Sequence, residues 1–219
     1  MNITIDEEVR AMVPGVALGV LFYEADVAPS GGEALEAFEA QCAELAQALT
    51  TGDIAELAHN AASRIAYRAL GKDPGKYRPA AEAMLRRVVK GKGLYHINNV
   101  VDVNNLISIT SGYSIGSYVT EKVEGDVVLV RADDDAYYPG IGKDDVHISH
   151  LPVLKDAAGY FGNPTSDSQR TMVTEGRHTV MSVVYAFDGT EGLGECLQRY
   201  ADALWCYCGV NKAEAAIIQ

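Results

Sequence analysis

The hydrophobic pattern of the chain changes its period at Gly112, and this change constrains the fold more than any other feature. Before Gly112, apolar residues recur every three or four positions, as in helices that bury one face. After it, they gather in short runs rich in Val, Ile and Tyr, bounded by turn signals, which is typical of strands. An apolar run over 15–27 predicts one earlier, buried strand. Strands and helices segregated in this way predict an α+β fold with mostly antiparallel or mixed sheets.

The same pattern gives approximate bounds for each element. We expect helices over residues 33–49, 53–70, 79–90, 99–111 and 190–208. We expect strands over residues 113–119, 126–132, 150–154 and 178–187. Asp53 is a plausible N-cap, with Glu56 three residues on, and Gly71 ends the same helix. Pro79 suits the first turn of the next helix, where proline loses no helical hydrogen bond.

Composition and length exclude several classes of protein. The 219 residues are 48% hydrophobic and 22% charged, which is typical of a globular protein with a sizeable core. The N-terminal residues 1–10 are polar and acidic, unlike a signal peptide, and no apolar run is long enough to span a membrane. Four cysteines without a CxxC pair indicate free thiols. We therefore expect a cytoplasmic protein that does not associate with membranes.

Charge is distributed unevenly along the chain. The net charge is −12, which argues against a protein that coats DNA or RNA through bulk charge. Yet residues 64–92 hold nine of the 18 basic side chains and two acidic ones, so this segment carries +7 and the remainder −19. A local cluster of this kind can hold phosphates. The alternative is a solvated pair of helices whose cations balance acidic neighbours elsewhere in the fold.

A run of amides begins the helix over 99–111. Asn98, Asp102 and Asn105 are spaced by four and three residues, so they share one helical face. Asn is a poor helix former because its amide competes for backbone hydrogen bonds, which makes this face costly if it served solubility alone. The face therefore indicates either a polar ligand pocket or a set of caps and loop contacts, and the sequence favours neither.

Patterns for metal and cofactor chemistry are weak. His147 and His150 form an HxxH beside Asp144, and Cys206 and Cys208 form a CxC, but such short pairs are common in proteins without a bound metal. No GxGxxG, GxxxxGK[ST] or GxSxG motif occurs in the sequence. We expect neither a metal nor a cofactor.

Three segments together resemble a known family. They are YRPAAEAMLRRVVKGK (77–92), HINNVVDVNNLISITSGYSIGSYVTEKVEGDVVLVRA (96–132) and residues 156–187. They resemble the B3/B4 domain, which is the editing domain of the phenylalanyl-tRNA synthetase beta subunit, and more closely the free-standing B3/B4 proteins. The resemblance implies a single domain over 1–219: an N-terminal strand and helical extension (1–76), the matching core (77–187) and a C-terminal helix (188–219). It also implies a three-layer α/β arrangement with a sandwich-like core and a pocket between layers.

The resemblance assigns roles residue by residue. The synthetase domain hydrolyses tyrosine wrongly esterified to tRNA, which requires a pocket that hydrogen-bonds a phenol. Its VVDVTNYV-like motif matches VVDVNNLI, which places its pocket asparagine on Asn105. The histidine of its PMHAFD-like turn falls on Gly116, and Pro164 stands where its GGIFGGE-like run has a carboxylate. Asp167, three residues further on, is the candidate to replace that carboxylate by positioning water.

We therefore expect a tRNA-associated protein that binds aminoacyl-tRNA and hydrolyses mischarged species in trans, without being a complete synthetase. The residues expected to bind the substrate are Asn98, Asp102, Asn105, Gly116, Tyr118, Arg170 and Thr171. The residues expected to bind the RNA are Arg78, Arg86, Arg87, Lys90 and Lys92. One alternative is a non-catalytic module that senses an amino acid or small metabolite. Another is an interaction domain whose basic patch docks to an acidic protein.

Overall fold

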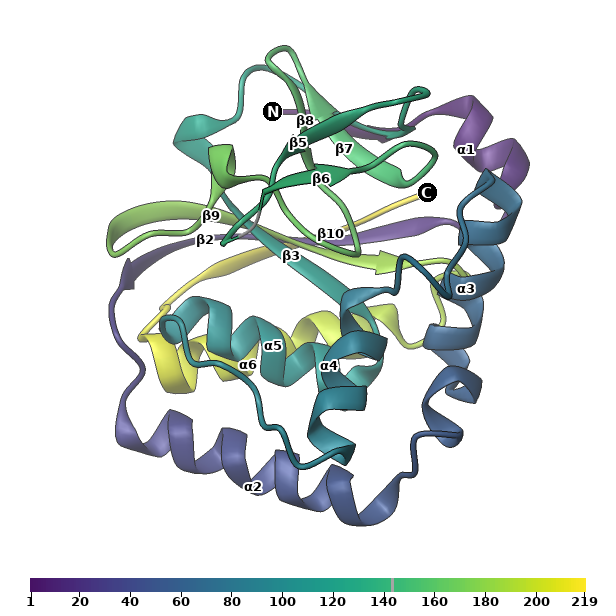
Figure 1. The fold of residues 1–219 in the computed structure, drawn as a ribbon. Helices are drawn as coiled ribbons and strands as arrows, with labels where there is room; N and C mark the ends of the chain where they lie inside the picture. Colours follow the sequence, from purple (N-terminus) through teal and green to yellow (C-terminus); the bar gives the residue numbers. More distant parts are fainter. Residues whose placement is uncertain (143) are drawn as a thin grey trace.

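The computed structural model describes residues 1–142 and 144–219, which form stacked layers of sheet and helix (Figure 1). The strands are β1 (Ile3–Ile5), β2 (Ala17–Val27), β3 (Ser114–Val119), β4 (Val127–Arg131), β5 (Tyr137–Pro139), β6 (Asp145–His147), β7 (Pro152–Asp156), β8 (Gly159–Gly162), β9 (Gly176–Ala186) and β10 (Ala213–Ile218). The helices are α1 (Glu7–Met12), α2 (Gly32–Ala48), α3 (Ala58–Leu70), α4 (Ala80–Val89), α5 (Asn99–Ser111) and α6 (Leu193–Cys208). Short 3₁₀ turns are η1 (Asp53–Glu56), η2 (Thr120–Lys122) and η3 (Gln169–Thr171).

Two four-stranded sheets carry the fold. The central sheet has the order β10-β2-β9-β3 and is antiparallel throughout. The outer sheet has the order β1-β4-β7-β8, in which only the β1–β4 pair is parallel. A separate hairpin joins β5 to β6. The expected α+β fold with mixed and antiparallel sheets is confirmed.

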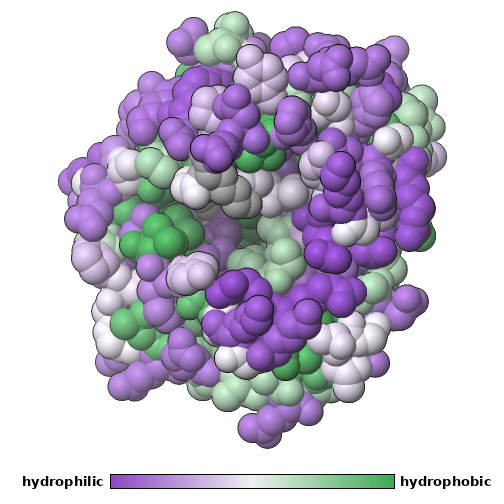
Figure 2. All heavy atoms as spheres, viewed as in Figure 1, coloured by the Kyte–Doolittle hydropathy of each residue, from purple (hydrophilic) through white to green (hydrophobic). Residues whose placement is uncertain are grey.

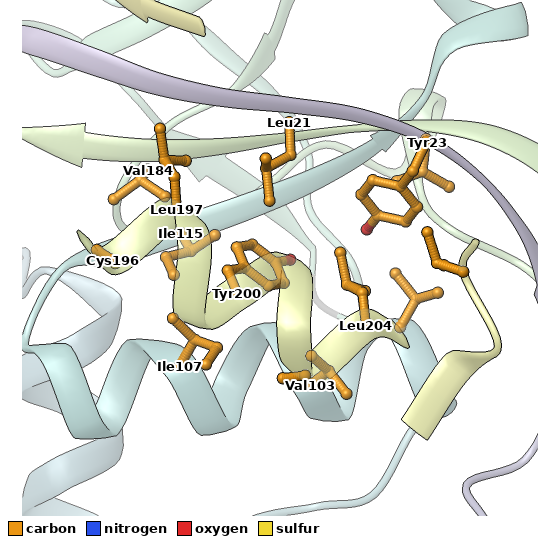
Figure 3. Close-up of a cluster of buried hydrophobic side chains, with 14 of the residues drawn as sticks. Leu21, Tyr23, Val103, Ile107, Ile115, Val184, Cys196, Leu197, Tyr200 and Leu204 are labelled. Atoms are coloured by element: carbon orange, nitrogen blue, oxygen red, sulfur yellow. The ribbon is translucent and has the colours of Figure 1, made fainter. Parts of the chain in front are cut away.

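The middle strands of the central sheet, β2 and β9, are covered on both faces, whereas the edge strand β10 is mostly exposed. One face packs against the outer sheet, where Leu18 of β2 and Met181 of β9 share an apolar cluster with Leu129 and Phe161. The other face packs against α5 and α6 (Figure 3), whose residues Ile107 and Leu197 belong to a second cluster. Helices α2 and α4 form a further layer around Phe38 and Leu85. Strand β3 is therefore an edge strand placed between the outer sheet, α4 and α5, and this edge positions the site described below.

Most expected elements lie within a few residues of the observed ones, with two corrections. Asp53 does not cap a helix: its carboxylate accepts hydrogen bonds from the backbone N–H and hydroxyl of Thr50, so a 3₁₀ turn forms and α3 begins only at Ala58. The C-terminal region is not helical throughout, because α6 ends at Gly209 and residues 213–218 form β10 beside β2.

Candidate functional site

The most unusual side-chain arrangement lies where β3, β8 and the loop over 163–168 meet. The hydroxyl of Tyr118 donates a hydrogen bond to Asp167 Oδ1 at 2.8 Å, and the backbone N–H of Asn163 donates to the same oxygen at 3.1 Å. Tyr118 is fully buried, whereas Asp167 is only half-buried. Asp167 thus links the interior to the surface. Among the described residues, no donor is bonded to its second oxygen, Oδ2.

Two glycines from facing sheets make room for the Tyr118 phenol. A Cβ atom on Gly116 would lie 2.0 Å from the Tyr118 hydroxyl oxygen, and one on Gly162 would lie 2.3 Å from it. Both distances are far below contact, so any side chain at either position would displace the phenol. The Cβ position of Gly116 is also 3.1 Å from Asp167 Oδ2. Asp167 therefore reaches the space over Gly116, and the phenol of Tyr118 fills much of that space.

The surroundings of Asp167 change its protonation. Burial raises the pKa of Asp167 to about 7, although the hydrogen bonds from Tyr118 and the Asn163 backbone lower it in part. Burial likewise raises the pKa values of Tyr118 and Tyr185 well above 10, and the two phenol oxygens lie 2.8 Å apart. The phenols therefore stay neutral at physiological pH, whereas the carboxyl titrates there.

The loop that carries Asp167 is braced on several sides. Asn163 Oδ1 accepts hydrogen bonds from the backbone N–H groups of Thr165 and Ser166, which closes a tight turn. The carbonyl of Pro164 accepts a hydrogen bond from the N–H of Ala80 at the start of α4. These contacts fix the turn, so Asp167 is presented by a constrained segment.

Two residues of the amide helix have structural partners. Asn98 caps α5 by accepting a hydrogen bond from the N–H of Val101. Asp102 is buried and accepts hydrogen bonds from the Ser30 hydroxyl at 2.6 Å and from the N–H of Ile97 at 2.9 Å. These contacts match the capping and loop-anchoring alternative, and neither residue forms a hydrogen bond with Asp167 in the described part of the chain.

The end of the amide run does approach β3. Asn104 donates hydrogen bonds to the carbonyl of Ile115, at the outer edge of β3, and to the side chain of Asn105. Asn104 Oδ1 also accepts a hydrogen bond from Ser117 at 3.0 Å. Asn105 thus lies near the strand that carries Gly116. The sequence did not single out Asn104, although it makes these contacts with β3. Its place directly before Asn105 in the motif VVDVNNLI was the feature that could have indicated it.

Arg170 and Thr171 lie in the 3₁₀ turn η3, directly after the loop that carries Asp167. Arg170 forms a bidentate ion pair with the buried carboxylate of Asp156, at 2.8 and 2.9 Å. Its guanidinium lies 5.4 Å from the ring centre of Phe161, and that ring packs edge-on against Tyr118. Thr171 is fully buried, and its hydroxyl has no hydrogen-bond partner among the described residues. Neither side chain forms a hydrogen bond with Asp167 in the described part of the chain, and the Phe161 ring lies between the Arg170 guanidinium and Tyr118 in this chain of contacts.

The basic segment divides into neutralised and free cations. The carboxylate of Glu82 is fully buried, lies 3.0 Å from Arg64 and 2.8 Å from Arg86, and has Arg78 at 3.9 Å. Lys90 and Lys92, by contrast, are exposed. Exposed positive charge is therefore present at the end of α4, and also at Arg68 and Lys76, which have no ion pair within residues 1–142 and 144–219.

The visible face of the molecule is hollowed near its centre (Figure 2), in front of β3 and above α4 and α5 as seen in Figure 1. A separate groove of about 440 Å³ is lined by the charged residues Glu24, Asp26, Arg177, Lys212 and Glu214. None of the predicted site residues lines that groove.

Other features of the described residues bear on the earlier expectations. His150 Nε2 bonds to Asp134, and no group of three His, Cys, Asp or Glu side chains in 1–142 and 144–219 is arranged to hold a metal ion. Asp144, which the sequence places near the HxxH pair, directly follows residue 143, the one residue outside the described ranges. No helix within these ranges combines the length and the apolar surface needed to cross a bilayer.

Comparisons with known proteins agree with this architecture. An N-terminal fragment of the phenylalanyl-tRNA synthetase beta subunit from Pyrococcus horikoshii has a similar fold, with a TM-score of 0.52 at 13% sequence identity. The match covers 99% of this chain and 50% of that one, so the chain spans about half the length of the fragment. A search of curated protein sequences gives no match. The sequence profile of the B3/4 domain matches residues 62–193, more than half of the chain, and the protein therefore belongs to the B3/4 domain family.

Proposed function

We propose that the protein binds aminoacyl-tRNA and hydrolyses the ester of mischarged species in trans. One observation carries this proposal: Asp167, a half-buried carboxyl with a pKa of about 7, lies beside the edge strand β3 with one oxygen free. Family membership and the fold shared with a fragment of a tRNA synthetase subunit support the choice of substrate.

Hydrolysis requires a group that accepts a proton from water and then releases it. Tyr118 and the Asn163 N–H hold Oδ1 of Asp167, which leaves Oδ2 to accept a hydrogen bond from water. The water oxygen attacks the ester carbon while its proton passes to Oδ2. The bond from this carbon to the ribose oxygen then breaks, and the proton moves to that oxygen. The products are the free amino acid and uncharged tRNA, and a pKa of about 7 suits both transfers at neutral pH.

A panel of mischarged aminoacyl-tRNAs tests this proposal. We expect deacylation of at least one member above the buffer rate and a loss of about 100-fold in Asp167→Asn, since a general base contributes about that factor. Asparagine keeps the acceptor at Oδ1, so the fold should persist. Asp134→Asn, at an exposed carboxyl bonded to His150, is the matched control and should retain full activity. No deacylation of any member would refute the enzymatic function.

The expected RNA contacts belong to the same proposal. Lys90, Lys92 and Arg87 would meet phosphates, whereas Arg78 and Arg86, which surround Glu82, would contribute mainly through the local field. Alanine at Lys90 and Lys92 should weaken tRNA binding and flatten its dependence on salt concentration, because each phosphate contact releases counterions.

A second candidate function is a module that binds an amino acid or small metabolite without catalysis. It is favoured by Gly116 and Pro164, which supply no imidazole or carboxylate for hydrolysis. Because the Tyr118 phenol fills much of the space over Gly116, such a ligand would bind beside that phenol. Thermal-shift screening separates the two functions. Stabilisation by a free amino acid, together with no salt-dependent tRNA binding, would support the binding module. Binding of tRNA without stabilisation by any amino acid would count against it.

A further inference from the structure

The loop between α4 and α5, residues 90–98, holds an exposed aromatic ring beside a guanidinium. The side chain of Tyr95 is 71% exposed, and the Arg87 guanidinium lies 4.7 Å from its ring centre. Arg87 is itself held in place, because its Nε donates a hydrogen bond to the carbonyl of Gly93. An arginine held over a ring orients that ring while leaving much of its surface open.

The loop is pinned so that Tyr95 points outward. Leu94 packs against the apolar cluster around Phe38 and Leu85. His96 Nδ1 lies 3.2 Å from Asp102 Oδ2, and the N–H of Ile97 donates to Asp102 Oδ1. Anchors on both sides of Tyr95 therefore fix the backbone that carries it. The buried Asp102 thus holds the exposed loop in place, which is one of the two roles that the sequence left open.

Near Tyr95 in the sequence the charged side chains are cations, whereas the carboxylates of Glu39 and Asp102 each lie 3.2 Å from the His96 ring. Residues 83–98 contain no acidic side chain. Arg87, Lys90 and Lys92 form no ion pair among the described residues, whereas Arg86 is paired with Glu82. In a chain with a net charge of −12, an uncompensated group of three cations beside an exposed ring is a distinct surface.

We propose that Tyr95 is a stacking platform for an unpaired base of single-stranded RNA, and that Arg87, Lys90 and Lys92 contact the phosphates next to that base. Cations alone would suit any polyanion. The exposed ring favours a nucleic acid, because every base offers a flat face for stacking, and a paired base is not free to stack on it. An acidic peptide would gain little from the ring.

The placement of the loop connects this surface to the candidate site. Figure 1 shows the α4–α5 loop crossing in front of α5, on the face that is hollowed in Figure 2. An unpaired 3′ end that stacks on Tyr95 would therefore lie on the same face as β3. The inference rests on the proposed function for the identity of the RNA, but not for the stacking itself.

Fluorescence anisotropy with a labelled hairpin RNA tests the platform. The hairpin ends in an unpaired CCA, and a blunt hairpin without the overhang is the comparison. We expect tighter binding of the overhang and a loss of about tenfold or more in Tyr95→Ala, with Tyr95→Phe close to the native protein because it keeps the ring. Tyr137→Ala, at another tyrosine that is 60% exposed, is the matched control and should bind normally.

Several outcomes would overturn the inference. They are equal binding of both hairpins, native affinity in Tyr95→Ala, an equal loss in Tyr137→Ala, and displacement of the overhang by polyglutamate at the same charge concentration. Deacylation measured in parallel separates this inference from the proposed function. Binding that depends on Tyr95 without any deacylation leaves the platform standing and refutes the catalysis. Deacylation that is unchanged in Tyr95→Ala, together with native affinity for the overhang hairpin, refutes the platform and leaves the catalysis standing.

Discussion

Tyr118 and Asp167 are joined by a hydrogen bond of 2.8 Å between the phenol oxygen and Oδ1, although 49 residues separate them in the sequence. The bond joins the central sheet to the loop after β8 and lies between two glycines that leave space for the phenol. Stability and the proposed chemistry therefore depend on the same few atoms.

Removing the Tyr118 hydroxyl should change both the stability of the fold and the pKa of Asp167. Tyr118→Phe leaves the Tyr185 hydroxyl without its partner and Asp167 with only the Asn163 N–H, so we expect a loss of about 1–3 kcal/mol in the free energy of unfolding. The lost bond had lowered the pKa of Asp167, so the acid limb of any deacylation profile should move to higher pH. Tyr138→Phe removes a hydroxyl that bonds to Ser166 and Asn163, and it should destabilise the protein without moving that limb. Denaturant titrations and pH–rate profiles of both variants would check this.

Gly116 should tolerate a side chain only if Tyr118 becomes smaller. Gly116→Ala places a Cβ atom 2.0 Å from the phenol oxygen, and we expect a loss of about 1–3 kcal/mol from the displaced ring. In a Tyr118→Leu background the same substitution should cost little, because the clash is gone. A double-mutant cycle by urea denaturation measures this coupling. Additive losses would contradict the assigned packing.

The dependence of stability on pH should carry the signature of Asp167. Its pKa is about 7 when folded, against about 3.9 in an unfolded chain, so between these values the folded state binds the additional proton. This stabilisation is present below about pH 4 and is lost as the pH rises through 7, by at most about 1.4 kcal/mol per unit. Asp167→Asn should remove this slope, which is measured as the difference between the two unfolding curves. Activity that depends on the carboxylate should rise over the same range.

Glu82 should be essential to the packing of α4. Glu82→Gln leaves Arg64 and Arg86 facing a neutral group in a buried position, and we expect a loss of about 3 kcal/mol or more. Arg86→Ala should also destabilise the protein, whereas Lys92→Ala, at an exposed residue, should not. Thermal unfolding of the three variants would reveal the order. A stable Glu82→Gln protein would mean that the carboxylate is not the anchor of these arginines.

The elements that could be predicted from the sequence are those whose own residues repeat clearly. Helix α5 has the predicted bounds because its apolar positions recur over three turns and Gly112 ends it. Strand β1 has only three residues, too few for a period to show, and the alanine-rich β10 resembles a helix in composition. Both become strands through pairing with β4 and β2, which no local pattern reveals.

The candidate site was predictable only in part, for the same reason. The motif indicated Gly116, Tyr118 and Asp167, but not that the phenol would fill the space between two glycines, because Gly162 comes from the opposite sheet. Asp102 carried the right residue type for a pocket. Its partner Ser30 lies 72 residues earlier, and that contact makes it an anchor instead. Long-range partners decide such roles.

The position of β2 in the central sheet has a consequence for how the protein forms. Its neighbours are β9, which pairs Ala17 with Ala186, and β10, which pairs Leu18 with Ile218. During synthesis β2 must therefore remain without its sheet partners until most of the chain has been made. Contacts between such distant segments slow folding and leave an apolar strand open to aggregation. A nascent chain that stops before β9 should consequently require more chaperone protection than one that extends through β10.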